Sequence, residues 1–402
     1  MIAYFLRVFE IYAREKMKKI KFIYHIIKFY IHRSLLCFFW FFPIKSNQFY
    51  FDTFNGAAFS CSPKYLFLEL LQAKLADVKN CYWTKKKNMV FRIDNIPKEN
   101  LCEPYSLKTI KKIMTSKFII VNTNIPSFIP LRNSQILINT WHGGGAYKKS
   151  GLDNEVENTN EMRFFAKYRA KQTTYMISSC RKATEAFKTN QLIPEQKNLC
   201  IGMPRNDYLI NNRYDKDYLR EQLGLNSSDF IVLYAPTYRT VKNKAVNTEL
   251  LLDYVKVGDE LKIKFGRNLK FLYRAHYYFS DSKNINDILN VTSYPDMQEL
   301  LAISDLLITD YSSCMWDFSL IKKPCFLFCP DLDDYDMSRG FYIPFEKLPF
   351  PISKSNDELV LKISEFELDD YLKKVTEHQS EMGSFEDGTA CKKICELVRK
   401  SM

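Results

Sequence analysis

The stretch LLITDYSS, residues 306–313, passes from an apolar, β-branched run to a polar run that ends in two serines. Leu306–Thr309 is typical of a buried strand, and the polar residues follow where that strand ends. A second tract repeats the arrangement, because the apolar run 135–139 precedes TWHGGG, residues 140–145. Ligands of open α/β sheets bind beyond the carboxyl ends of the strands. The two tracts therefore predict an α/β fold with a ligand site at its strand ends.

Strand-like and helical segments alternate along the chain from residue 48 onward. One series runs to residue 201, with a short strand predicted at 91–93, and a second series, with a helix predicted over 248–265, runs from 230 to 328. Turn-forming and polar residues between 202 and 217 separate them. The pattern predicts two Rossmann-like, doubly wound domains facing a cleft, with boundaries at 46–207 and 208–402.

The net charge of +12 is concentrated at the N-terminus, because residues 1–45 hold nine Lys/Arg against Glu10 and Glu15. The remaining 357 residues carry only +5, which argues against a nucleic-acid partner that would require a basic stripe on a folded domain. Basic residues recur at helical spacing on an otherwise apolar segment: Arg14, Lys18, Lys21, His25, Lys28 and His32. This pattern predicts an amphipathic helix lying on an anionic membrane surface. A helix docked on the protein's own core is the alternative.

Neither the cysteines nor the acidic residues predict a metal site. The eleven cysteines contain no CxxC pair, so reduced buried thiols are favoured over disulfides. The acidic tract 331–336 lacks the glycine and terminal glutamate of an EF-hand, and solvated turn carboxylates are the better interpretation. We expect no essential metal and no cofactor.

The polar residues at the strand ends can bind phosphate. Ser312 and Ser313 stand at the predicted start of a helix over 313–321, where unpaired N–H groups and the helix dipole favour an anion. Ordinary capping by these serines or by Asp310 is the alternative. Arg239 and Arg274 follow two other predicted strands, and Arg suits bidentate phosphate contact. We therefore expect these strand ends to share one anion site.

Two histidines lie at strand ends, and both are candidates for function. His142 is followed by Gly143, Gly144 and Gly145, which let a ligand approach the main chain. An imidazole can accept a hydroxyl proton near neutral pH. His276 follows the strand that carries Arg274. Lys148 could hold an anionic acceptor, although a solvated surface lysine is an equal alternative.

Together these tracts resemble the CDP-glycerol glycerophosphotransferase family of teichoic acid synthesis. The similarity covers roughly residues 48–400 in the family's order. Its motifs are Phe54-Asn55-Gly56, Ser62-Pro63-Lys64-Tyr65, Thr140-Trp141-His142-Gly143, Gly202-Met203-Pro204-Arg205-Asn206-Asp207, Tyr234-Ala235-Pro236-Thr237-Tyr238-Arg239, Arg274-Ala275-His276, Ile308-Thr309-Asp310-Tyr311-Ser312-Ser313 with Asp317, Arg339-Gly340-Phe341-Tyr342 and Phe385-Glu386-Asp387-Gly388.

The resemblance implies a GT-B fold and a peripheral enzyme at the cytoplasmic face of the bacterial membrane. It implies that His142 is the catalytic base and that the glycines 143–145 and Lys148 face the acceptor. It also implies that His276 is a second catalytic histidine. The donor-binding residues that would hold the CDP-linked substrate are Arg239, Arg274, Thr309, Asp310, Tyr311, Ser312, Ser313 and Asp317.

Two departures from the family pattern leave the acceptor open. Many members have Trp-His-Gly-Thr-Pro-Leu-Lys, whereas Gly144-Gly145-Ala146-Tyr147-Lys148 follows here, and many have His-Pro where this chain has His276-Tyr277. The long N-terminal region of the processive polymerases also has no counterpart. A priming enzyme, a single-addition enzyme or one acting on capsule or another surface polysaccharide is equally compatible.

The resulting hypothesis is transfer of glycerol phosphate, or a related alditol phosphate, from its CDP-activated form. The acceptor would be a hydroxyl of a membrane-anchored polymer or its lipid-linked precursor, with release of CMP. One alternative is a GT-B glycosyltransferase that uses a nucleotide sugar. The other is a non-catalytic, membrane-associated interaction protein. The oligomeric state is not indicated by the sequence.

Overall fold

The computed structural model describes residues 2–89, 96–156, 158–237, 240–241, 244–245, 251–266, 268–275, 288–333, 335 and 340–402. Side chains are described from residue 16 onward, except for Lys18 and residues 240–245. The strand predicted at 91–93 lies outside the described residues, and so do Arg239 and His276.

The N-terminal half is built on a seven-stranded parallel sheet in the order β3-β2-β1-β4-β5-β6-β7. Its leading strands form the Rossmann order, in which the crevice at the switch point lies between the first and fourth strands. The strands are β1 (Lys45–Asp52), β2 (Cys81–Thr84), β3 (Leu101–Cys102), β4 (Ser116–Val121), β5 (Ile136–Asn139), β6 (Tyr175–Ser178) and β7 (Asn198–Cys200). The helices among them are α2 (Cys61–Gln72), α3 (Leu107–Thr115), α4 (Asn160–Gln172) and α5 (Arg181–Asn190).

The C-terminal half repeats that order with six parallel strands, β12-β11-β8-β13-β14-β15. They are β8 (Phe230–Ala235), β11 (Leu269–Tyr273), β12 (Ile288–Asn290), β13 (Leu306–Thr309), β14 (Cys325–Phe328) and β15 (Ile352–Ser353). The accompanying helices are α8 (Tyr254–Phe265), α9 (Met297–Ile303), α10 (Cys314–Ser319), α12 (Asn356–Ser364) and α13 (Leu368–Met382), and a small hairpin joins β9 (Thr240–Val241) to β10 (Lys244–Ala245). The prediction of two parallel α/β sheets is confirmed.

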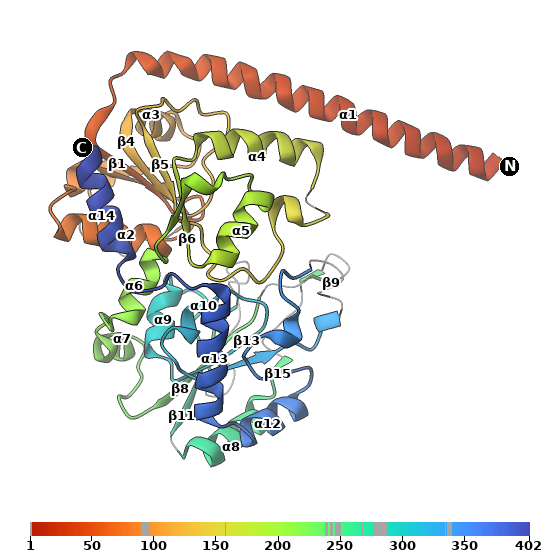
Figure 1. Ribbon diagram of the computed structural model, residues 1–402, viewed down its shortest axis with the longest axis vertical. Coiled ribbons are helices and arrows are strands. Elements are labelled where there is room, and N and C mark those ends of the chain that lie inside the picture. Colours follow the sequence, from red (N-terminus) through yellow and green to blue (C-terminus); the bar gives the residue numbers. More distant parts are fainter. Residues whose placement is uncertain are drawn as a thin grey trace.

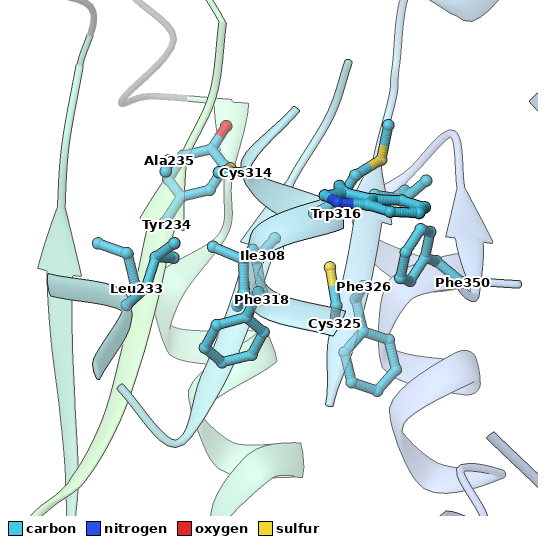
Figure 2. Close-up of a cluster of buried hydrophobic side chains, with 14 of the residues drawn as sticks. Leu233, Tyr234, Ala235, Ile308, Cys314, Trp316, Phe318, Cys325, Phe326 and Phe350 are labelled. Carbon is cyan, nitrogen blue, oxygen red and sulfur yellow. The ribbon is translucent and has the colours of Figure 1, made fainter. Parts of the chain in front are cut away.

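The C-terminal core explains why β13 reads as a continuous apolar run. Every residue of β8, β13 and β14 is buried, as expected for strands that helices cover on both faces. Figure 2 shows Leu233, Ile308 and Phe326 from these three strands gathered beneath α10, which contributes Phe318. This packing fixes the strand end at which Ser312 and Ser313 emerge.

Helix ends correct some of the predicted boundaries. The helix predicted over 248–265 begins at Tyr254, because Asp253 caps it by accepting a hydrogen bond from the backbone N–H of Lys256 at 3.0 Å. The helix predicted over 313–321 is shorter, Cys314–Ser319. Two short helices, α6 (Pro204–Ile210) and α7 (Lys216–Gln222), occupy the segment predicted as a link.

The chain returns to the N-terminal half at its end. Helix α14 (Ala390–Ser401) lies beside α2, while α13 runs along the C-terminal half (Figure 1). Ile394, Cys395 and Val398 pack in one core with Phe49 and Leu66 of the N-terminal half. The predicted boundary 208–402 placed this last helix in the other domain, and the structure differs there because its apolar face is buried against α2.

The N-terminal helix α1 (Ile2–Leu36) projects from the body of the molecule (Figure 1). One side of α1 packs against the body of the molecule. Phe29 is buried against aromatic rings of α4, and His25 lies 2.7 Å from Glu161. His32 packs against Phe128. Two members of the predicted basic stripe therefore contact the protein.

The other side of α1 is apolar and exposed. Its large side chains include Met17, Ile20, Ile23, Tyr24, Ile27, Ile31 and Leu35. Exposed Lys21 and Lys28 accompany them on the helix. The described part of α1 is not long and apolar enough to cross a bilayer, nor is any other described helix.

Candidate active site

The loop after β5 places His142 at the edge of the N-terminal sheet. Thr140 remains tied to the neighbouring strand, since its backbone N–H donates to the carbonyl of Val121 at 2.7 Å. Trp141 then adopts a left-handed backbone with φ 55°, and its N–H is accepted by the side-chain oxygen of Asn139 at 2.9 Å. This sharp turn directs the chain out of the sheet, so His142 stands beyond the switch-point crevice.

The imidazole of His142 is held in one tautomer. Its Nδ1 lies 2.8 Å from the backbone carbonyl of Asn122, which can only accept, so Nδ1 carries the proton. Nε2 therefore keeps its lone pair. Burial, with the positive charges of Arg205 and Lys148, lowers the pKa of His142 below its usual value despite the hydrogen bond to Asn122. A neutral imidazole with a free lone pair can act as a base at neutral pH.

The glycines after His142 contact the other half of the molecule. A β-carbon built on Gly143 would lie 3.6 Å from Oγ of Ser313, and one built on Gly144 would lie 2.1 Å from Cδ1 of Trp316. A side chain at 144 is thus incompatible with the position of α10. Because the glycines have no side chains, the His142 loop can pack against the start of α10. This contact joins two tracts that lie 170 residues apart in the sequence.

The five polar residues at the end of β13 and directly after it, Thr309 to Ser313, divide into two groups. Thr309, Asp310 and Tyr311 are buried and bonded within the C-terminal half: Thr309 donates to the carbonyl of Ala235 at 2.7 Å, and Asp310 accepts from the N–H of Thr237. Ser312 and Ser313 are only half-buried, and Ser313 makes no side-chain capping bond. The serines are therefore the members of this run whose side chains remain partly exposed, and Ser313 also lines the pocket described below.

Arg274 provides a half-buried positive charge near Cys314, the first residue of α10. Burial lowers its pKa below the usual value, although the negative charges of Asp296 and Glu299 oppose this shift. Its Nη1 has no hydrogen-bond partner among the described residues. A desolvated guanidinium of this kind is costly unless an anion completes it. Phosphate is the anion that its geometry suits.

The structure adds Arg205, whose importance the sequence analysis did not recognise. This side chain is buried in α6, and its guanidinium donates to the backbone carbonyl of His142 at 2.7 Å. It also forms an ion pair with Asp317 of α10 at 2.8 Å. Asp317 further accepts from Gln298 at 2.9 Å, so its carboxylate is directed at protein groups. The sequence signal for Arg205 is the family motif at residues 202–207. By themselves these residues predict only a turn.

A second acid, the half-buried Glu386, lies between α13 and α14 and contacts the same helices, α6 and α10. Its carboxylate accepts hydrogen bonds from Trp316 of α10, Asn206 of α6 and the backbone N–H of Met203. Burial raises the pKa of Glu386 to about 8, although the hydrogen bonds oppose this rise. Glu386 thus links α6 to α10, the helix that contacts the glycine loop.

The His142 loop and Ser313 line one pocket of about 220 Å³ between the two halves. His142, Gly143, Gly144, Gly145 and Lys148 form one side together with residues of α5, and Tyr311 and Ser313 approach from the C-terminal half. Arg274 is not among the residues that line it, and it lies near Cys314, just beyond Ser313. Among the described residues no cluster of three potential metal ligands occurs.

Two parallel sheets of Rossmann order, with strand ends that meet around a pocket, define a GT-B-like fold. The chain belongs to the CDP-glycerol:poly(glycerophosphate) glycerophosphotransferase family, which it matches over residues 34–400. The resemblance inferred from the sequence motifs is thereby confirmed.

Its relatives include the teichoic acid poly(glycerol phosphate) polymerase of Staphylococcus epidermidis, 31% identical over 89% of this chain and 51% of that one. The teichoic acid glycerol-phosphate transferase of Staphylococcus aureus is 29% identical over 89% of this chain and 94% of that protein. The chain spans about half the length of the polymerases of S. epidermidis and Bacillus subtilis.

The wall teichoic acid polymerase TagF has a similar solved structure. A histidine-to-asparagine variant of it, soaked with CDPG, superposes with a TM-score of 0.78 at 27% identity, over 96% of this chain and 98% of that one. The arrangement of the two sheets is therefore shared along nearly the whole chain.

Proposed function

We propose that this protein transfers glycerol phosphate from CDP-glycerol to a hydroxyl of a membrane-anchored polymer or its lipid-linked precursor, releasing CMP. The observation that carries the proposal is the pocket shared by His142 and Ser313, which places a neutral base beside a possible phosphate site. Membership of the glycerophosphotransferase family supports the donor.

In the proposed reaction the acceptor hydroxyl gives its proton to Nε2 of His142. Its oxygen attacks the phosphorus of the glycerol phosphate group, and a new P–O bond forms. The bond from that phosphorus to the bridging oxygen breaks, so CMP leaves with the electron pair. Positioning and electrostatic stabilisation supply most of the rate acceleration in phosphoryl transfer.

The donor diphosphate would be held by Arg274, Ser312 and Ser313. The unpartnered Nη1 of Arg274 supports this assignment, and so do the half-buried hydroxyls of the two serines. Arg239 and His276 remain sequence-based assignments to the donor site and to catalysis. Asp317 would act through Arg205, while Thr309, Asp310 and Tyr311 would fix the shape of the loop.

The exposed apolar face of α1 would rest on the membrane. Seven large apolar side chains exposed on this face support the proposal, and Lys21 and Lys28 suit an anionic leaflet. Docking of the opposite face through Phe29 and His25 would hold the catalytic body at the surface. The cytoplasmic leaflet is proposed because a CDP-activated donor would be available there.

The test is a donor screen with purified full-length protein and membranes as the acceptor source. Release of CMP from CDP-glycerol or CDP-ribitol is expected, together with incorporation of the labelled alditol into the membrane fraction. Release of UDP or GDP from nucleotide sugars would instead establish a glycosyltransferase. No release, with no nucleotide raising the melting temperature, would favour a non-catalytic protein, because ligands of the native state stabilise it by mass action.

A further inference from the structure

The loop after β1 contains a residue with an unfavourable backbone conformation. Phe54, Asn55 and Gly56 are all left-handed, with φ of 50°, 53° and 78°. Glycine and asparagine visit this region readily, but a bulky residue such as phenylalanine rarely does. Such outliers persist only where the surrounding structure holds them, and they cluster at functional sites. The conformation of Phe54 therefore requires an explanation beyond the turn itself.

Hydrogen bonds and close packing hold this turn in place. The backbone N–H of Phe54 donates to Oδ1 of Asn122 at 2.9 Å, and the carbonyl of Gly56 accepts from the N–H of Lys86 at 2.9 Å. Asn122 directly follows β4 and is fully buried. A β-carbon built on Gly56 would lie 3.0 Å from Cγ2 of Thr84, the last residue of β2. The turn is thus fixed against the ends of both neighbouring strands.

Asn122 holds this turn and the proposed base at the same time. Its side chain accepts from Phe54, and its backbone carbonyl accepts from Nδ1 of His142 at 2.8 Å. The ring of Phe54 lies against the imidazole, with the ring centroids 5.7 Å apart and the planes at 72°. The ring of Trp141, which precedes His142 in the chain, lies 4.6 Å from the imidazole. Phe54 is therefore an aromatic neighbour of His142 that comes from a different strand end.

Charged groups near His142 come from other elements. Arg205 of α6 and Lys148, which follows the glycines, lower the pKa of His142 through their positive charges. Two further titratable groups, Cys61 of α2 and Asp317 of α10, contact Arg205. Burial is the largest cause of the lowered pKa, because an imidazolium is disfavoured away from water. An apolar ring packed on the imidazole contributes to this burial.

Resting on the proposed function, we infer that Phe54 and Asn122 are positioning residues for the base His142. Asn122 fixes the aromatic ring and the imidazole in one arrangement. The ring shields the imidazole from water and keeps it in the Nδ1–H tautomer, which leaves Nε2 for the acceptor hydroxyl. The ring follows β1 and the carbonyl follows β4, so the two strands at the switch point orient the base together.

Nuclear magnetic resonance of full-length protein, with histidine labelled at its ring nitrogens, tests the inference. The chain has five histidines, and His142→Gln assigns the signal of this one. The wild type should show the Nδ1–H tautomer and a pKa below 6.5. In Phe54→Ala the pKa should rise toward 6.5 and a second tautomer should appear. Phe54→Gly should do the same, and glycine suits the left-handed backbone, so this variant keeps the turn. Asn122→Leu, which removes the acceptor of the Phe54 N–H, should also shift both properties.

Phe59→Ala is the matched control. Phe59 lies in the same segment, but its ring packs on Phe67 and Trp83. Its loss should lower the melting temperature without changing the pKa or the tautomer of His142. In assays of CMP release, Phe54→Ala should lower kcat about 10–10²-fold, because the base is misplaced, while the Kd for CDP-glycerol changes little. Phe54→Tyr keeps the ring and should retain the wild-type kcat.

An unchanged pKa and tautomer of His142 in both ring-removing variants, or in Asn122→Leu, would overturn the inference. A lowered pKa in the ring-removing variants would also overturn it, and so would an equal shift in Phe59→Ala. Absence of CMP release by the wild type would instead refute the proposed function. The resonance comparison would still decide whether Phe54 and Asn122 orient the imidazole, because it does not depend on turnover.

Discussion

Arg205 of α6 and Asp317 of α10 form a buried ion pair, with the guanidinium Nη2 2.8 Å from one carboxylate oxygen and 3.1 Å from the other. The same guanidinium holds the carbonyl of His142 at 2.7 Å. One side chain therefore sets the position of the proposed base relative to the helix that follows the serines. The pair also joins α6 to α10 of the C-terminal half.

Breaking this pair should destabilise the protein more than removing it entirely. Arg205→Met leaves the Asp317 carboxylate buried and unpaired, and a loss of about 3–5 kcal/mol in the free energy of unfolding is expected. The double variant Arg205→Met/Asp317→Leu removes both charges and should recover much of that loss. Urea unfolding followed by fluorescence measures both. Equal destabilisation of the single and double variants would show that the pairing has little energetic weight.

Turnover should depend on the neutral imidazole of His142. His142→Ala is expected to lower kcat about 10²–10⁴-fold, because it removes a general base, while the Kd for CDP-glycerol changes little. CMP release and calorimetry measure the two quantities. Unaltered kcat in this variant would eliminate the base assignment.

The pH profile gives a second test of the same group. The folded-state pKa of His142 lies below its usual value of 6.5, so the base form predominates at pH 7 and above. The value of kcat/KM should therefore stay constant at pH 7 and above, and it should decline only as the pH falls below about 6.5. An acid limb centred well above pH 7 would contradict this assignment.

Two neighbouring glycines should respond differently to the same substitution. Gly144→Ala places a β-carbon 2.1 Å from Trp316, so the loop and α10 must separate. Overpacking of this kind costs about 1–3 kcal/mol. Gly143→Ala makes contacts no closer than 3.5 Å and should leave the melting temperature nearly unchanged. Similar thermal unfolding of the two variants would argue against the close approach of the two halves.

Membrane binding should be lost when the exposed face of α1 becomes charged. In Ile23→Asp/Ile27→Asp each apolar side chain removed from lipid forfeits about 1.5–3 kcal/mol, so vesicle binding should weaken at least tenfold. Ile263→Asp/Leu361→Asp is the matched control, because both residues are exposed on helices of the C-terminal half. Co-sedimentation with vesicles containing phosphatidylglycerol measures the binding. Equal binding by both double variants would refute the proposed role of α1.

Much of the fold could be predicted because buried parallel strands leave apolar runs that the sequence shows directly. Leu306–Thr309 is a strand with the predicted bounds, and the second series begins at residue 230 as predicted, with the strand Phe230–Ala235. The predicted boundary 208–402 assigned the last helix to the wrong half, because Ile394 and Val398 form an apolar face that could pack on either core. Local periodicity indicates that an apolar face will be buried, but it does not indicate which distant surface buries it.

The sequence by itself determined the α/β class, the family motifs and the strand ends at which His142, Arg274 and Ser313 stand. Only the tertiary structure decided that Gly144 meets Trp316 and that Arg205 pairs with Asp317. The physical reason is the separation along the sequence between the residues that interact. Strand and helix patterns arise between residues close in sequence, whereas contacts across the two halves depend on how two separately built sheets pack together.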